Sequence, residues 1–499
     1  VVDAASYSTI ILKKAASSSL TPAFKLASLT KGLKRDLQQQ WFVGDESYAS
    51  LVENHFVQVD RYPITGLTPN VDRASYSNIR RFINMKSHVP PDAVRLEEML
   101  NYFNLDYEPP RNNQIFDINT VLTSCPWNPH SQLLFANIRS RKVSPESLPP
   151  THFVFLIDIS GSMDLPTRLP LLKAAFRGMV INLRSKDSVS IVVYGGSVGI
   201  ALNTTGGDEK QKIYDVLDSL QAEGSTPGES GLRLAYSVAR KHFIQGGNNR
   251  VILATDGDFN VGIKSEEELE ELIRSQKESG IYLTCLGVGM GNYKDSKIQT
   301  LAQKGNGNYA YLDTYLEAEK VLLKEFMQTF YVIADDVYLN IEFKPEEIKE
   351  YRLLGFDNKA GAIKDSLASI EGGEISSGYS VLVAFEIVPH KNEDILQNSV
   401  SFSLQYKIPG QNKVNYLTQS PQLMYTSINE LPQSYRFATA LLMFGSLLRN
   451  SKFVKDKTWT EMYEIALASA DASNKEQKEF IELVLHAKNL YTKKKKWSL

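Results

Sequence analysis

The stretch "FLIDISGSMD" at residues 155–164 places an acid and two serines at alternate positions directly after an apolar run. The apolar run predicts a buried strand, so Asp158, Ser160 and Ser162 stand where that strand ends. Alternate positions let the three side chains point the same way, and Gly161 lets the backbone bend tightly. An acid and two hydroxyls at the end of a buried strand predict a site for a ligand.

Predicted strands and helices alternate around this stretch. Four apolar runs are nearly continuous, namely HFVFLID, SVSIVVYG, RVILATDG and IYLTCLGVG. Such runs are typical of parallel strands that are covered on both faces. The stretches with helical spacing are RLPLLKAAFRGMVINL, EKQKIYDVLDSL, GESGLRLAYSVARKHF and SEEELEELIRSQKESG. This order predicts an α/β domain at 151–333 with a doubly wound, mostly parallel, Rossmann-like sheet.

Two later loops add oxygen groups to the same edge, because ligands of such sheets bind outside the carboxyl ends of the strands. Asp256 stands at the end of a later strand, and Thr226 lies in a loop that leads into a helix. Together with Asp158, Ser160 and Ser162 they suit a hard divalent cation such as Mg²⁺. Only two of the five groups are carboxylates, so we expect the cation to attract one further oxygen from outside. The alternative, that Asp158 and Ser160 only cap the next helix, explains neither later residue.

The motifs DISGSM, GSTPGESGL and ATDGD resemble the three loops of the metal-ion-dependent adhesion site (MIDAS) of von Willebrand factor type A domains. The resemblance implies that Asp158, Ser160 and Ser162 are first-loop ligands. It makes Thr226 the second-loop ligand and Asp256 a third-loop ligand that often acts through water. It also implies Mg²⁺, or Mn²⁺ or Ca²⁺, as the bound ion, and an Asp or Glu carboxylate of a protein partner as the missing ligand.

Glu229 departs from the family pattern, in which the second loop consists mostly of small residues. It follows Pro227 and Gly228 directly. If its carboxylate faced the metal, it would fill the open position or repel an acidic partner. We favour a place in the first turn of the following helix, where the helix dipole stabilises an acid.

The flanking segments VDRASYSNIRRFIN and PPDAVRLEEMLNYFNLDYEPP, with the extended C-terminal region, resemble the bacterial YfbK-like von Willebrand type A proteins. This resemblance implies a location in the bacterial cell envelope, as a periplasmic, outer-membrane-associated or surface protein. No apolar stretch approaches the roughly 18 to 20 residues of a membrane span. We therefore predict no transmembrane segment, and anchoring by a segment outside the given chain stays open.

Composition and spacing divide the rest of the chain. Residues 1–45 are rich in Ser, Ala and Lys and predict a linker or a partly ordered lead-in. We expect a helical hairpin and strands at 46–150, a β-sandwich at 334–429 and a helical region at 430–499. Because two strands alone are only marginally stable, those at 115–143 are expected to join the later sandwich. The α/β domain would then be an insertion.

Two motifs imitate other sites. GGSVG, residues 195–199, fits the pattern of a hydrolase nucleophile elbow, but a strand rather than a helix is predicted after it, so Ser197 is interpreted as a hairpin turn. DGDFNVGIKSEE has acids at the spacing of a calcium loop, yet Val261 stands where that loop requires Gly. The seven histidines are scattered and form no recognisable catalytic arrangement with Ser or Cys.

The remaining composition limits the function classes. A formal net charge of -2 makes nucleic acid an unexpected partner, and two cysteines are too few for a disulfide scaffold or a structural zinc site. We therefore predict a metal-dependent protein-binding protein that acts in adhesion or assembly and is not an enzyme. The alternatives are a structural scaffold with a non-essential metal site and a metal-assisted hydrolase, for which no general base is evident.

Overall fold

The computed structural model describes residues 46, 48, 50–105, 107–111, 114–225, 227–257, 266–289, 294–356, 372–391, 395–397, 399–454 and 457–492. The predicted lead-in at 1–45 lies outside these residues. Two compact units are formed: Ser144–Tyr331, here called the α/β unit, and Ala49–Val143 with Val332–Leu499, here called the sandwich unit.

The α/β unit is built on a six-stranded sheet with the order β10-β9-β8-β5-β6-β7. All neighbouring strands are parallel except β7, which pairs antiparallel with β6. The strands are β5 (Thr151–Asp158), β6 (Ser188–Gly195), β7 (Ser197–Gly206), β8 (Asn248–Thr255), β9 (Ile281–Val288) and β10 (Tyr309–Leu312). Every residue of β5 is buried, as a central strand covered on both faces requires. The doubly wound fold class is confirmed.

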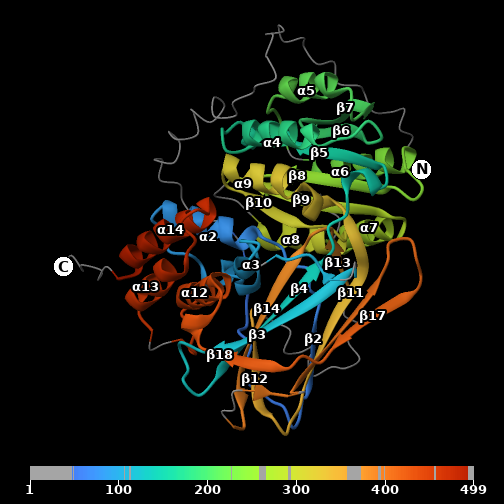
Figure 1. The fold of residues 1–499 in the computed structure, drawn as a ribbon. Coiled ribbons are helices and arrows are strands. Elements are labelled where there is room, and N and C mark those ends of the chain that lie inside the picture. Colours follow the sequence, from blue (N-terminus) through green and yellow to red (C-terminus); the bar gives the residue numbers. More distant parts are fainter. Residues whose placement is uncertain are drawn as a thin grey trace, which may run out of the picture. The chain divides into compact units, whose positions relative to one another are not determined.

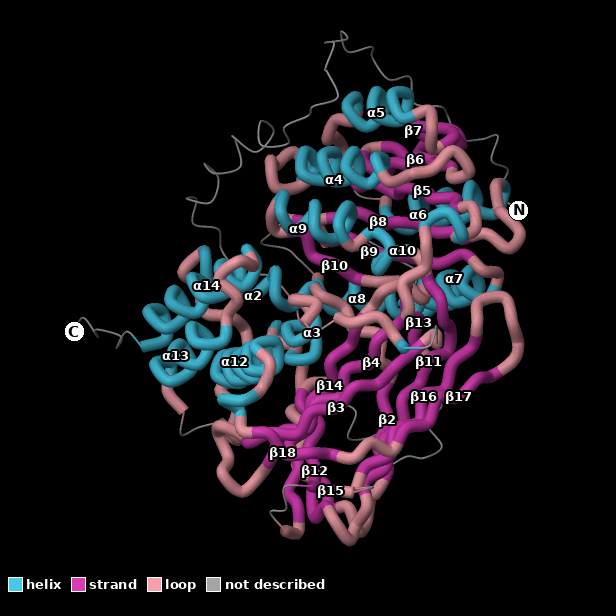
Figure 2. Tube along the Cα trace, viewed as in Figure 1, coloured by secondary structure: helices cyan, strands magenta, loops and turns pink. Residues whose placement is uncertain are grey.

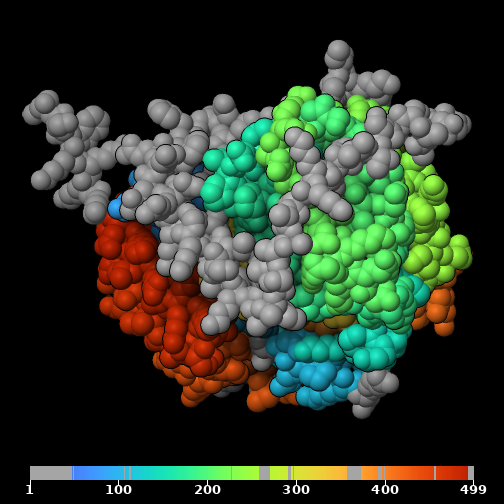
Figure 3. Space-filling model, turned by 90° about the horizontal axis from the view of Figure 1, so that it is seen from above, coloured from blue at the N-terminus to red at the C-terminus, as the bar shows by residue number. Residues whose placement is uncertain are grey.

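Helices cover the sheet of the α/β unit (Figure 1). They are α4 (Leu169–Ile181), α5 (Lys210–Ser219), α6 (Gly228–Lys241), α7 (Glu266–Glu278), α8 (Asp295–Lys304), α9 (Tyr315–Glu319) and α10 (Phe326–Phe330). Helix α6 packs on β5, β6 and β8, whereas α7 and α8 pack on β9. In the view from above, the teal atoms of α4 lie beside the green atoms of α5 (Figure 3).

The hairpin of β6 and β7 contains the motif GGSVG at residues 195–199. Strand β6 ends at Gly195 and β7 begins at Ser197, so the serine stands at a two-strand turn and no helix follows it. This confirms the interpretation of GGSVG as a turn. Of the calcium-loop motif, residues 258–265 lie outside the described part of the chain.

The sandwich unit contains two sheets, one with the order β1-β12-β14-β4-β3-β18-β15 and one with β13-β11-β16-β17, in which β2 also pairs with β11. The strands are β1 (Val57–Gln58), β2 (Ile64–Leu67), β3 (Phe116–Ser124), β4 (Gln132–Ser140), β11 (Val332–Phe343), β12 (Ile348–Leu354), β13 (Gly373–Ser376), β14 (Ser380–Pro389), β15 (Ile395–Leu396), β16 (Val400–Lys407), β17 (Val414–Gln419) and β18 (Leu423–Thr426). Figure 2 shows these strands in magenta.

Strand β4 pairs with β14 in antiparallel register from Ser380 opposite Arg139 to Ile387 opposite Gln132. The chain therefore begins this sheet before the α/β unit and returns to complete it afterwards. This pairing confirms that the strands at 115–143 belong to the later sandwich. Strands β1 and β2 were not predicted, because short strands carry too few residues for an alternating pattern to be visible.

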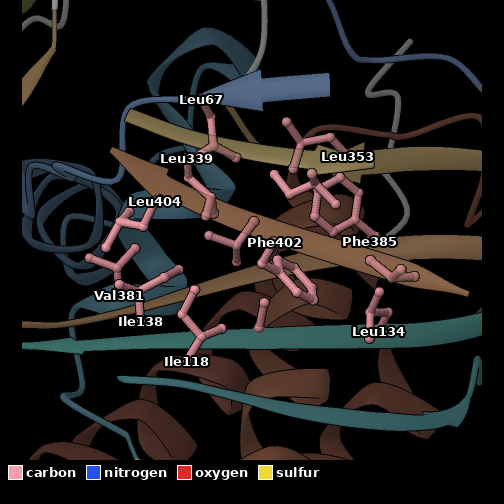
Figure 4. Close-up of a cluster of buried hydrophobic side chains, with 14 of the residues drawn as sticks. Leu67, Ile118, Leu134, Ile138, Leu339, Leu353, Val381, Phe385, Phe402 and Leu404 are labelled. Atoms are coloured by element: carbon pink, nitrogen blue, oxygen red, sulfur yellow. The ribbon is translucent and has the colours of Figure 1, made fainter. Parts of the chain in front are cut away.

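Apolar side chains of both sheets meet in one core (Figure 4). The core residues labelled there are Leu67, Ile118, Leu134, Ile138, Leu339, Leu353, Val381, Phe385, Phe402 and Leu404. All of them are at most 7% exposed. Burial of this shared apolar surface explains why segments far apart in the sequence form a single sandwich.

Among the described residues of the sandwich unit, five α-helices accompany the sheets: α2 (Ala74–Asn84), α3 (Leu96–Asn101), α12 (Gln433–Leu448), α13 (Trp459–Ser469) and α14 (Lys475–Thr492). The red helix α14 packs on the blue helix α2, and α12 packs on α3 (Figure 1). Helix α13 begins with a capping box in which Thr458 and Glu461 satisfy each other's backbone amides. Within the described part of the chain, none of the helices has the length and hydropathy that a membrane span requires.

Candidate metal-binding site

Asp158 ends β5 at the carboxyl edge of the parallel sheet. Its side chain is fully buried, with 0% exposure. One carboxylate oxygen, Oδ1, accepts a hydrogen bond of 2.9 Å from the backbone N–H of Ser160. The other, Oδ2, accepts one of 3.1 Å from the hydroxyl of Thr255, the last residue of β8. The carboxylate is thus fixed by its own loop and by the neighbouring strand.

The two serines of the first loop lie together. The Oγ atoms of Ser160 and Ser162 are 3.1 Å apart, so the alternate spacing does place both hydroxyls on one side. Ser160 is buried and Ser162 is exposed. A 3₁₀ turn at Gly161–Met163 carries the second serine. The first loop therefore runs from the buried Asp158 and Ser160 to Ser162 at the surface.

Backbone hydrogen bonds hold the second loop against the first loop and against the turn between β6 and β7. Gly161 N–H donates to the carbonyl of Gly224 at 2.9 Å, and Gly196 N–H donates to the carbonyl of Ser225 at 2.9 Å. Gly224 has φ +76°, and a Cβ there would lie 2.1 Å from the Cα of Gly196, so only glycine fits. Thr226 itself lies outside the described residues. Its position as a ligand stays a prediction.

Asp256 belongs to the third loop, directly after β8, and is 5% exposed. Its Oδ2 accepts a hydrogen bond of 2.5 Å from Nη1 of Arg168, which also donates to the carbonyl of Ser162 at 2.8 Å. A chain of hydrogen bonds thus connects Asp158 to Ser160 and Ser160 to Ser162, and Arg168 extends it from Ser162 to Asp256. Thr255 and Arg168 were not predicted from the sequence. Thr255 could have been found as the neighbour of Asp256, whereas Arg168 gives no comparable signal.

Burial dominates the electrostatics of the site. It raises the pKa of Asp158 to about 6, and the charge of Asp256 adds to this effect. Hydrogen bonds from Ser160 and Thr255 act in the opposite direction. Burial also raises the pKa of Tyr194 well above its ordinary value, with the charge of Asp158 contributing. A carboxylate in such surroundings is destabilised as an anion, and a cation beside it would remove that cost.

The donor set of this edge fits a hard cation. Mg²⁺ prefers oxygen ligands and usually retains several waters, and it needs few carboxylates from the protein. The described residues contain no cluster of three His, Cys, Asp or Glu side chains, and at this edge two carboxylates are accompanied by hydroxyl groups. Asp158, Ser160, Ser162 and Asp256 are therefore suited to hold Mg²⁺ rather than a softer metal such as zinc.

Glu229 lies in the first turn of α6, as predicted. Its Oε1 accepts a hydrogen bond of 2.8 Å from Nε of Arg233, one turn further along the same helix. Glutamate followed by a cation at this spacing stabilises a helix locally. The carboxylate of Glu229 is therefore bound by an arginine of its own helix, α6.

One His–Ser contact was not predicted. His152 Nε2 lies 3.1 Å from Ser190 Oγ, which in turn lies 2.8 Å from Thr204 Oγ1. His152 and Ser190 are both 0% exposed, since they stand near the starts of β5 and β6 inside the sheet. No substrate can reach this pair in the folded state, so the contact is structural.

Protonation of His152 is expected to destabilise the fold as the pH falls. Burial lowers the pKa of His152 from 6.5 to about 4, and the charge of His242 adds to this. The unfolded chain takes up this proton at a higher pH than the folded chain does. The contribution of the neutral His152 to the free energy of unfolding is therefore complete above pH 6.5 and is lost as the pH falls toward 4. The loss is about 3 kcal/mol. In urea unfolding at about pH 7 and pH 4.5, His152→Gln should decline less than the wild type; an equal decline contradicts the assignment.

Comparison with known proteins agrees with this architecture. The model of the von Willebrand factor type A domain matches residues 153–328, and that described as "Uncharacterized protein YfbK, C-terminal" matches 328–490. A further model, described as "von Willebrand factor", matches residues 43–135. The "Uncharacterized protein YfbK" of Escherichia coli (strain K12) is 35% identical over 467 residues, which cover 88% of this chain and 81% of the relative.

The chain belongs to the YfbK family of von Willebrand factor type A domain proteins. Its type A region is also 28% identical to inter-alpha-trypsin inhibitor heavy chain H3 of Homo sapiens over 182 residues, which cover 34% of this chain and 20% of that protein. A solved von Willebrand factor type A protein from Catenulispora acidiphila is 14% identical, with a TM-score of 0.45, and covers 76% of this chain and 91% of its own. Proteins with type A domains generally mediate protein interaction or adhesion.

Proposed function

We propose that the protein binds a partner protein through a divalent cation at the carboxyl edge of the α/β sheet. The observation that carries the proposal is the fully buried carboxylate of Asp158, which is held within one network with hydroxyl groups and Asp256. Asp158, Ser160, Ser162 and Asp256, with Thr226 from the second loop, would hold Mg²⁺, or Mn²⁺ or Ca²⁺ in its place. The bound cation supplies an open coordination position that attracts an anionic oxygen.

The residues of the chain determine what can bind there. Ser162 and Gly161 are exposed, so the first loop brings the site to the surface. Glu229 accepts a hydrogen bond from Arg233 on its own helix. We therefore expect it to leave the open position to an external ligand. An Asp or Glu carboxylate of the partner would complete the site as a charge-assisted, direction-dependent contact within a larger interface. We place this interaction in the bacterial cell envelope, in the periplasm, at the outer membrane or at the cell surface.

The protein is proposed to bind and not to catalyse. A metal-assisted hydrolase would need a general base that can reach the substrate. The His152–Ser190 pair is fully buried and therefore unsuited to that role. The other candidate, a structural scaffold in an envelope complex, differs from metal-dependent binding in one measurable property: the scaffold would keep its partners after the metal is removed.

The proposal is tested by affinity capture from the native envelope with wild-type protein, with Asp158→Ala and with Glu229→Ala, each with and without chelator. We expect a partner that is retained by the wild type only with metal, and by Asp158→Ala under neither condition. Glu229→Ala serves as the matched control, because its carboxylate contacts Arg233, and it should retain the partner as well as the wild type or better.

Single Asp→Asn and Glu→Gln substitutions on the contact surface of the partner then identify the carboxylate that binds the metal. One such change should reproduce the loss caused by the chelator. A partner that is retained equally by Asp158→Ala and in chelator would instead favour the scaffold. If no single change on the partner reproduces the loss, the carboxylate contact is wrong.

A further inference from the structure

Arg168 joins two loops of the candidate metal site. It immediately precedes α4 and is 9% exposed. Its Nη1 donates to Asp256 Oδ2 at 2.5 Å and to the carbonyl of Ser162 at 2.8 Å. The same guanidinium thus contacts the third-loop carboxylate and the backbone of the first loop.

The arginine is also fixed at its base. Its backbone N–H donates to the carbonyl of Leu165 at 2.9 Å, and its carbonyl accepts from Leu172 N–H at 3.0 Å. The side chain crosses Gly289 so closely that a Cβ there would lie 2.4 Å from Arg168 Nε, and Gly289 has φ +81°. Because both the backbone and the guanidinium of Arg168 are held, the side chain stays beside Asp256 without a large further loss of conformational entropy.

The position of Arg168 changes the charge that a bound cation presents. Asp158 and Asp256 contribute two negative charges, which would neutralise a divalent cation completely. Arg168 returns one positive charge through its contact with Asp256. In a partly buried site, a unit charge a few ångströms away changes the affinity for another charge strongly. Among the described residues, the charges of the cation, Asp158, Asp256 and Arg168 then sum to one positive charge, which favours an anionic ligand.

We propose that Arg168 sets the ligand preference of the site, because it weakens the affinity for the metal and strengthens the affinity of the loaded site for carboxylate. This inference rests on the proposed metal-dependent binding. It makes Arg168 a positioning residue for Asp256 and a determinant of specificity. The two effects have opposite signs, which a purely structural role would not produce.

The test uses the full chain, with Mn²⁺ as the metal and acetate as the carboxylate probe. Isothermal titration gives the Kd for Mn²⁺, and water-proton relaxation of the Mn²⁺-loaded protein gives the Kd for acetate. Arg168→Gln should bind Mn²⁺ about tenfold more tightly and acetate about tenfold more weakly than the wild type. Arg168→Lys keeps the charge and should stay within about twofold for both ligands.

Arg177→Gln is the matched control. Arg177 lies on α4, donates to Asp218 at 2.6 Å and stacks on Tyr214. Its replacement therefore removes a nearby arginine in the helix that follows Arg168 and leaves the contacts of Asp256 unchanged. Its two Kd values should equal those of the wild type. Unchanged Kd values in a folded Arg168→Gln would overturn the inference and leave the metal site standing. If Arg168→Gln did not fold, a large loss of acetate affinity in Arg168→Lys would overturn it. A wild type that bound no Mn²⁺ would refute this inference together with the proposed function.

Discussion

Asp158→Ala is expected to abolish the stabilisation of the protein by Mg²⁺. At a concentration about 100 times its Kd, a cation that binds only the folded state adds about 2.7 kcal/mol to the free energy of unfolding. For a unit of this size, that corresponds to a rise in Tm of roughly 5 to 10 °C. Asp158 is the most buried acid of the site and is held by both Ser160 and Thr255, so its loss should remove the rise completely.

The measurement is a thermal melt with and without Mg²⁺, with circular dichroism to show that the variant is folded. Glu229→Ala is the control, since Glu229 contacts Arg233 on its own helix, and it should keep the full rise in Tm. An equal rise in Asp158→Ala and in the wild type would show that the cation binds elsewhere.

Phe385→Ala is expected to lower the free energy of unfolding of the sandwich unit by about 3 to 5 kcal/mol, because it removes a large buried side chain and leaves a cavity. Phe385 lies on β14 and is 0% exposed. Its ring centroid lies 5.5 Å from that of Phe343 and 6.3 Å from that of Tyr351. These rings come from strands on both sides of the core, so no single neighbour can fill the space.

Urea unfolding of the full chain measures this effect. Tyr416→Ala is the matched control, because Tyr416 is an aromatic residue of the same unit that is 65% exposed, and its replacement should change the free energy by less than about 0.5 kcal/mol. If Phe385→Ala lost as little stability as Tyr416→Ala, the core between the two sheets would be assigned wrongly.

The sequence by itself determined the elements that depend on neighbouring residues. The apolar runs predicted β5, β6, β8 and β9, because strands covered on both faces need apolar residues throughout. The serine spacing predicted two hydroxyls on one side, and the Oγ atoms of Ser160 and Ser162 do lie 3.1 Å apart. Glu229 was placed correctly in a first helical turn. Each of these properties follows from the geometry of a few consecutive residues.

Only the tertiary structure decided which distant residues meet. Arg168 contacts Asp256 across 88 positions, and the hydroxyl of Thr255 reaches Asp158 across 97. Such contacts depend on which strands are neighbours and on their register, and local periodicity carries information about neither. The His152–Ser190 contact was missed for the same reason. The sequence therefore determined the elements and the candidate ligands. The tertiary arrangement of strands and loops decided that the guanidinium of Arg168 lies beside Asp256, and it created the buried surroundings that raise the pKa of Asp158.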